Sequence, residues 1–198
     1  MDLVLIRHPA PAIEAGICYG STDVPLAGDA AESARALAAR LAALAVPPPS
    51  RFATSPLRRC ADVAHRLALL LGKACGSDIR LREIDFGAWE GQRWDAIDRA
   101  ALDAWSADLR HARAHGGESV AQFEARVDAW LAMCREPAAA SGASVLAVTH
   151  AGVMRMIAAL LLGESIETTL KWPLEMAAVV WFQRGEHAGD WRLLHWNV

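Results

Sequence analysis

The chain opens on a run of four aliphatic residues (3–6) that ends in Arg7 and His8. A run of this kind is typical of a strand buried on both faces, as in the parallel sheets of α/β proteins. Pro9 and Pro11 prevent the strand from continuing, so the chain must turn at His8. In open α/β sheets, ligands bind in the crevice beyond the carboxyl ends of the strands. We therefore expect Arg7 and His8 to face a binding site.

A second stretch repeats this design much later in the chain. Residues 144–149 form another apolar run, His150 follows it, and a helix begins at once with Ala151 and Gly152. If the two strands are neighbours, His8 and His150 lie in one crevice, and the N–H groups at the helix start point into the same space. Two imidazoles, a guanidinium group and a helix N-terminus together favour an anion such as phosphate.

The remaining pattern alternates strands with helices, which indicates a mostly parallel sheet covered on both faces. We expect an α/β fold, a three-layer α/β/α sandwich, formed by residues 1–198 as a single domain. The sequence predicts helices at 29–44, 55–71, 93–113, 119–134 and 151–163, and strands at 51–54, from 79 onwards, at 176–182 and at 191–196.

Composition excludes several classes of partner. The net charge is −3 without a basic cluster, so neither nucleic acid nor a membrane surface is expected as a partner. No apolar run is long enough to span a bilayer, and the first strand leaves no room for a signal peptide. The four cysteines are scattered and are expected to stay reduced in a cytoplasmic protein. Eight tryptophans leave enough apolar surface for a homodimer contact.

Two arginines lie at the start of an expected helix, where positive charge is unfavourable. Ser55 and Pro56 begin the second helix, with Ser55 as its cap, so Arg58 and Arg59 occupy the first turn, where the helix dipole disfavours cations. Either both side chains simply reach solvent, or an anion lies at this helix start and one arginine helps to hold it. The unfavourable placement argues for the anion.

Three carboxylates, Glu83, Asp85 and Glu90, lie within eight positions. Acids in such clusters are usually solvated, but the apolar residues at 84, 86 and 89 indicate partial burial here. Burial raises the pKa of a carboxyl group and suits it to donate a proton. Glu83 is the best candidate for this role.

Two further pairs of polar residues each allow a structural and a functional interpretation. Ser21 and Thr22 lie in the loop 13–25, either in a plain surface connection or with hydroxyl groups that contact phosphate. His111 and His115 have the spacing of a metal-binding pair on a helix, but no third ligand accompanies them. We interpret both histidines as surface residues and expect no metal or other cofactor.

Five motifs in order resemble the histidine phosphatase superfamily, which includes the phosphoglycerate mutases. They cover most of the chain, and together they are far more specific than any one alone. They are Arg7-His8, the stretch 55–60 that opens a helix, the stretch 81–91 around Glu83, Gly116 to Ser119, and Thr149 to Val153.

The resemblance implies a phosphoglycerate mutase-like fold and a phosphatase that works without a metal ion. It implies that His8 is phosphorylated, that Glu83 donates the proton, and that Arg7, Arg59 and His150 bind the phosphoryl group. The family spacing thus selects Arg59 over Arg58. We also expect the arginines to keep His8 neutral near pH 7, because they disfavour a further positive charge.

The chain departs from the family pattern at two positions. Pro9 replaces a glycine, and Glu14 replaces an asparagine that touches phosphate, a contact that Ser21 or Thr22 would then supply. The short chain and the stretch 18–26 resemble the α-ribazole phosphatases, which act on a small phosphate ester late in cobalamin assembly. A phosphoglycerate mutase is the alternative, but it usually closes its site with a C-terminal tail, which favours hydrolysis here. A non-catalytic phospho-ligand binding protein is the other alternative.

Overall fold

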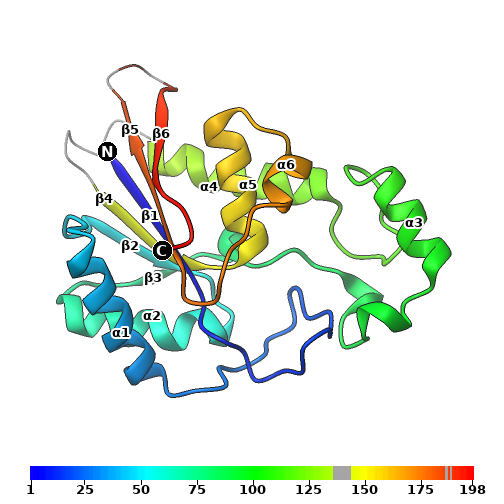
Figure 1. Cartoon of the computed structure of the whole chain (residues 1–198), viewed down its shortest axis with the longest axis horizontal. Helices are drawn as coiled ribbons and strands as arrows, with labels where there is room; N and C mark the ends of the chain where they lie inside the picture. Colours follow the sequence, from blue (N-terminus) through cyan, green and yellow to red (C-terminus); the bar gives the residue numbers. More distant parts are fainter. Residues whose placement is uncertain (136–143, 186, 188) are drawn as a thin grey trace.

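The computed structural model describes residues 1–135, 144–185, 187 and 189–198, and a six-stranded sheet forms its centre. The strands follow one another across the sheet in the order β3-β2-β4-β1-β5-β6 (Figure 1). The first four are mutually parallel, β5 is antiparallel to β1, and β6 is antiparallel to β5. The strands are β1 (Asp2–Arg7), β2 (Arg51–Thr54), β3 (Gly76–Ser77), β4 (Ser144–Thr149), β5 (Val179–Arg184) and β6 (Trp191–His195).

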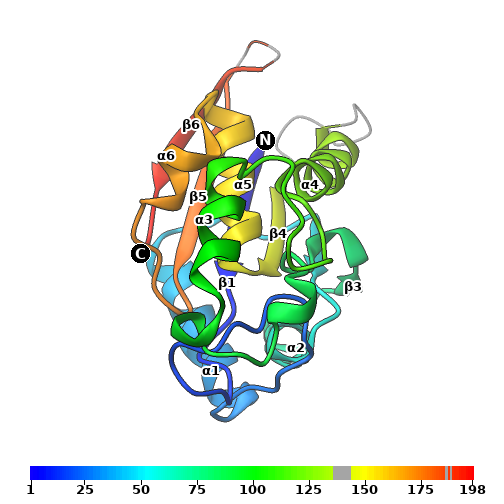
Figure 2. The same ribbon diagram turned by 90° about the vertical axis from the view of Figure 1, so that its right-hand side faces the viewer.

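The helices cover both faces of this sheet, as the side chains of β1 show. Leu3 and Leu5 pack against α4 and α5, whereas Val4 and Ile6 pack against α1 and α2 on the other face (Figures 1 and 2). This alternation follows from the two-residue period of a strand. The helices are α1 (Ala30–Ala43), α2 (Arg58–Leu71), α3 (Arg99–Ala107), α4 (Val120–Arg135), α5 (Ala151–Leu162) and α6 (Ile166–Leu170). The predicted three-layer α/β/α architecture is confirmed.

Local signals account for several helix ends. Asp29 caps α1, because its side chain accepts a hydrogen bond of 2.7 Å from the backbone N–H of Glu32. Gly163 ends α5 with φ of 70°, a conformation that glycine adopts at little cost. The predicted final hairpin is present as β5 and β6, although part of its turn lies outside the described residues.

Three local predictions were wrong. The stretch from Ile79 is not a strand but a 3₁₀ turn, η1 (Ile79–Leu81), because side chains and not a neighbouring strand bind its carbonyl groups. The helix expected over 93–113 is shorter: a 3₁₀ turn, η3 (Trp94–Ala96), precedes α3, which Asp98 caps and which ends at Ala107. Ser55 does not cap α2, which begins after Leu57. Within the described residues, no helix has the length and apolar character needed to cross a membrane.

Candidate active site

The pairing of β1 with β4 brings the two histidines together. Arg7 is opposite Thr149 in the parallel register, so the next residues, His8 and His150, leave the sheet side by side. Their ring centroids are 5.2 Å apart with an interplanar angle of 62°. His8 is 2% exposed and His150 is completely buried. The two imidazoles thus lie side by side, as the sequence predicted.

The surroundings of His8 fix both its tautomer and its charge. Its Nδ1 lies 2.7 Å from the carbonyl oxygen of Pro9, and since a carbonyl only accepts, Nδ1 carries the proton. The lone pair of the neutral ring then resides on Nε2 and is available as a nucleophile. Burial lowers the pKa of His8 to about 3, and the charges of Arg59 and Arg7 act in the same direction. His8 is neutral at pH 7, as predicted, but burial contributes more to this than the arginines do.

His150 is held from the side of α2. Its Nε2 lies 2.8 Å from the hydroxyl oxygen of Ser55, and the sulfur of Cys60 is 3.4 Å from the same nitrogen. Ser55, the expected helix cap, thus binds a histidine instead. Burial holds the pKa of His150 well below its ordinary value, and the charge of Arg59 adds to this effect.

The structure distinguishes the two adjacent arginines of α2. Arg58 is exposed, whereas Arg59 is completely buried, with its guanidinium group donating to the carbonyl oxygens of Gly20 (2.6 Å) and Thr22 (2.7 Å). The anion at the start of this helix is the carboxylate of Asp23, which accepts a 2.7 Å hydrogen bond from the backbone N–H of Arg58.

Arg7 completes the cationic side of the site. Its guanidinium group donates to the carbonyl oxygen of Leu174, in the segment between α6 and β5. The charges of Arg7 and Arg59 both lower the pKa of His8 and of His150, so the two guanidinium groups lie near both rings. This arrangement leaves the site positively charged through its arginines and not through its histidines.

Glu83 reaches the same place from the segment after η1. Its two carboxylate oxygens accept hydrogen bonds from the backbone N–H groups of Gly152 (3.0 Å) and Ile84 (3.1 Å). A Cβ atom at position 152 would lie 2.3 Å from a carboxylate oxygen of Glu83, so only glycine allows this approach. The start of α5, two residues after His150, therefore holds the carboxylate of Glu83.

Ser21 and Thr22 lie near Arg59, but their polar groups bind a protein carboxylate. Both hydroxyl groups donate to Glu90, which also accepts from the backbone N–H groups of Ser21 (2.8 Å), Thr22 (2.6 Å) and Phe86 (2.9 Å). Glu90 thereby anchors the loop whose carbonyl groups hold Arg59. The sequence placed Glu90 among three clustered acids but contained no signal for its partners Ser21 and Thr22, which lie in a distant loop.

We expect Glu90→Gln to weaken phosphate binding about tenfold, because in either orientation its amide nitrogen would face at least one backbone N–H donor and the loop that holds Arg59 would loosen. The inhibition constant of inorganic phosphate measures this effect. Glu164→Gln removes an exposed carboxylate just after α5, away from this loop, and should leave the constant unchanged. An unchanged constant for Glu90→Gln would contradict the anchoring role.

His111 and His115 differ from each other. His111 is exposed, as expected, but the interpretation of His115 as a surface residue was wrong, because its side chain is 2% exposed. Its ring lies against Phe86, Trp89 and Trp105, and its Nδ1 accepts a 3.0 Å hydrogen bond from the N–H of Gly117. Among the described residues, no group of three or more His, Cys, Asp or Glu side chains is placed to hold a metal ion.

Comparisons with known proteins agree with this geometry. Residues 3–198 match the family model of the histidine phosphatase superfamily, branch 1. A glucosyl-3-phosphoglycerate phosphatase of Mycolicibacterium vanbaalenii is 33% identical over 99% of this chain and 94% of its own length. A probable phosphoglycerate mutase of Salmonella choleraesuis is 30% identical over 82% of this chain and 75% of its own length.

Solved structures show the same fold. The α-ribazole phosphatase of Shigella flexneri superposes with a TM-score of 0.84 at 24% identity, covering 100% of this chain and 96% of the other. A mycobacterial glucosyl-3-phosphoglycerate phosphatase superposes with a TM-score of 0.82 at 29% identity, covering 99% and 98%. The chain thus belongs to the histidine phosphatase superfamily, a family of phosphatases and mutases, and is an enzyme of that family.

Proposed function

We propose that the protein hydrolyses small phosphate monoesters through a phosphohistidine at His8, without a metal ion. The observation that carries this proposal is the pair of buried neutral imidazoles 5.2 Å apart, next to two arginines. Nε2 of His8 attacks phosphorus while the ester P–O bond breaks, and Arg7, Arg59 and His150 stabilise the charge on the phosphoryl oxygens. Arginine side chains can supply the positive charge that a metal ion supplies in other phosphatases.

Glu83 is the proposed proton donor and acceptor. In its protonated form it donates to the departing alkoxide, which leaves as the alcohol. The resulting carboxylate then takes a proton from the water molecule that attacks the phosphohistidine. That second step releases orthophosphate and regenerates both neutral His8 and protonated Glu83.

The lining of the space beside Glu83 supports an apolar leaving group. A cavity of about 200 Å³ adjoins Glu83 and Gly152, and its walls are mostly aromatic and aliphatic. The lining includes the large side chains of Phe86, Trp105, Leu109, Phe123, Met156 and Leu170. Such walls favour an alcohol that carries a ring or other apolar group over one that carries only hydroxyl groups.

Charged groups are scarce in this lining. Among the described residues that line the cavity, one charged side chain accompanies Glu83: Arg155, whose guanidinium group already donates to the carbonyl oxygen of Trp172 at 2.9 Å. A leaving group with a carboxylate or many hydroxyl groups would lose its hydration for few new hydrogen bonds. We therefore propose α-ribazole phosphate, with its benzimidazole ring, or a similar ring-bearing ester as substrate, ahead of 3-phosphoglycerate and glucosyl-3-phosphoglycerate.

The phosphohistidine can be trapped directly. Rapid acid-free quenching during turnover of a ³²P-labelled ester should leave alkali-stable, acid-labile phosphate on the wild-type chain and none on His8→Asn. Turnover should be unchanged in excess chelator, whereas a metal requirement would overturn the mechanism. Absence of turnover and of label with every ester would support a binding protein that lacks catalysis.

A panel of esters tests the substrate class. Hydrolysis should be most efficient with α-ribazole phosphate, weaker with nucleoside monophosphates, and weakest with 3-phosphoglycerate and glucosyl-3-phosphoglycerate. Formation of 2-phosphoglycerate from 3-phosphoglycerate at a comparable rate would favour the mutase alternative.

Trp105→Ala tests whether the cavity binds the leaving group and not the phosphoryl group. We expect the kcat/KM for ring-bearing esters to fall about tenfold, because one aromatic wall is lost, and that for a short alkyl phosphate to change little. Steady-state kinetics on the two esters measures the difference. An equal loss for both would contradict the assignment of the cavity to the leaving group.

We also place the protein in the cytoplasm, in line with the unpaired state of Cys18, Cys60, Cys75 and Cys134. Its proposed partner is the small-molecule ester, with a homodimer as the proposed assembly. Analytical ultracentrifugation decides the assembly.

A further inference from the structure

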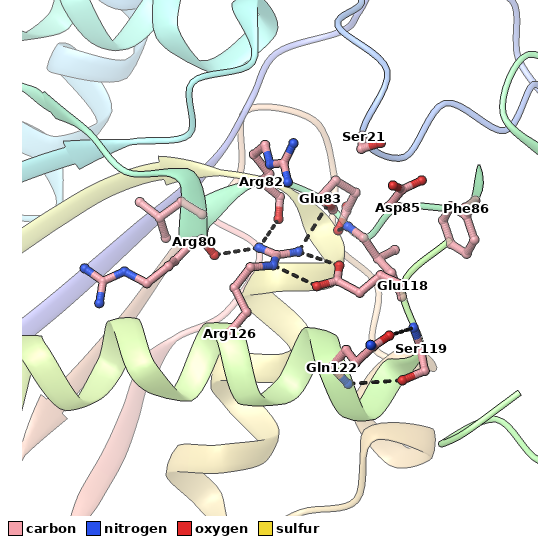
Figure 3. A network of polar contacts seen from close by, with 12 residues as sticks. Ser21, Arg80, Arg82, Glu83, Asp85, Phe86, Glu118, Ser119, Gln122 and Arg126 are labelled. Atoms are coloured by element: carbon pink, nitrogen blue, oxygen red, sulfur yellow. Dashed lines mark hydrogen bonds and ion pairs between the residues drawn. The ribbon is translucent and has the colours of Figure 1, made fainter. Parts of the chain in front are cut away.

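Arg126 has an unusually complete set of hydrogen bonds. It lies on α4, and its guanidinium group makes five of them, one for each N–H donor (Figure 3). Two go to the carboxylate of Glu118, at 2.9 and 2.7 Å. The other three go to the backbone carbonyl oxygens of Arg80 (2.7 Å), Arg82 (2.9 Å) and Glu83 (3.4 Å).

These carbonyl groups belong to the segment that carries the proposed proton donor. Residues 80–83 are not part of the sheet, so no neighbouring strand binds their backbone. Arg126 binds one side of the segment, and from β4 the hydroxyl group of Thr149 donates to the carbonyl oxygen of Leu81 at 2.8 Å. Together, two side chains replace the hydrogen bonds that a strand would have supplied.

Glu118, which lies just before α4, binds the chain two residues beyond the segment 80–83. Its backbone N–H donates to the carbonyl oxygen of Asp85 at 2.8 Å, and its side chain fixes the guanidinium group of Arg126. Both side chains are less than one-fifth exposed, so solvent screens this ion pair weakly. Neither residue lines the cavity beside Glu83, which excludes direct contact with a leaving group bound there.

We propose that Arg126, held by Glu118, is a positioning residue for Glu83. By fixing the backbone at 80–83, it keeps the carboxyl group of Glu83 beside Gly152, facing the oxygen that leaves. Carboxyl groups displaced by as little as 1 Å lose much of their value as proton donors. This inference rests on the proposed role of Glu83 in the reaction.

The dependence of the rate on the leaving group tests the proposal. p-Nitrophenolate leaves without help from an acid, whereas an alkoxide needs a proton. We expect Arg126→Met to slow the hydrolysis of an alkyl phosphate about 100-fold in kcat, with less than about a threefold effect on p-nitrophenyl phosphate and little change in KM. Glu83→Gln should show the same selectivity, and the double variant should be no slower than Glu83→Gln alone.

Two further variants separate positioning from folding. Arg126→Lys keeps a cation with three donors and should give an intermediate loss on the alkyl ester, and it replaces Arg126→Met if that variant does not fold. Arg110→Met removes a second Arg–Glu pair, between Arg110 and Glu124 of α4, which is more exposed and does not bind the segment 80–83. It should leave both rates unchanged.

The outcomes distinguish the proton-donor role of Glu83 from the positioning role of Arg126. Equal losses on both esters would show that Arg126 only supports the fold, and unchanged rates on both would show that it does not position Glu83. If Glu83→Gln itself shows no dependence on the leaving group, Glu83 is not the proton donor, and the positioning role proposed for Arg126 fails with it. If Glu83→Gln is selective and the Arg126 variants are not, the positioning role alone is overturned.

Discussion

His8→Ala is expected to lower kcat for an aryl phosphate by at least ~10⁴-fold, the largest effect of any single substitution in this chain. The variant loses the nitrogen that forms the covalent bond to phosphorus in the proposed mechanism. His150 cannot substitute, because Ser55 and Cys60 occupy the vicinity of its Nε2. Steady-state assays with a fluorogenic aryl phosphate measure the loss.

His65→Ala is the matched control for this substitution. It removes an exposed histidine from α2, away from the two buried rings, and should leave kcat unchanged. The arginines remain in His8→Ala, so inorganic phosphate should still bind with little change in affinity. Residual activity above one per cent of wild type would contradict a covalent role for His8.

The second large effect concerns stability in acid. The pKa of His8 is about 3 in the folded chain and 6.5 in the unfolded chain, so between these values the unfolded chain binds more protons. The contribution of neutral His8 is therefore fully present above pH 6.5 and is lost as the pH falls towards 3. A shift of this size corresponds to on the order of 5 kcal/mol in the free energy of unfolding. Burial lowers the pKa of His150 in the same direction, which adds to the effect.

Urea unfolding between pH 7 and pH 4.5 measures this dependence. We expect the free energy of unfolding to fall with a slope approaching about 1.4 kcal/mol per pH unit for each buried histidine. His8→Asn should remove the share of that slope that comes from His8, whereas His150 and His115, whose pKa values burial also lowers, continue to resist protonation. Carboxylates titrate at lower pH, which limits their influence within this window. A wild-type stability that is independent of pH across the range would contradict the burial of two neutral histidines.

The strands that position the site were predictable from the sequence because they are short and strongly patterned. The runs at 3–6 and 144–149 are apolar on both faces, and each ends in a polar residue, which located His8 and His150 at one sheet edge. The spacing of the resemblance selected Arg59 over Arg58, and the buried position of Arg59 agrees with that choice.

The predictions failed where side chains from distant segments determine the local structure. The stretch at 79–83 alternates like a strand, but Arg126 and Thr149 bind its carbonyl groups and fold it into η1 instead. Likewise, the hydroxyl groups of Ser21 and Thr22 are taken up by Glu90. Local sequence patterns carry no information about such long-range partners, which is why the supporting contacts around the site had to come from the structure.

The pairing of β1 with β4 also bears on how the enzyme regains its function after unfolding. This contact joins the first residues of the chain to residues that follow α4, so closing it carries one of the larger entropic costs in the fold. A fragment that ends before Ser144 contains His8 but has no partner strand and no second imidazole. Recovery of hydrolysis during refolding therefore reports completion of the whole sheet, and it should lag behind the recovery of helical signal from α1 and α2.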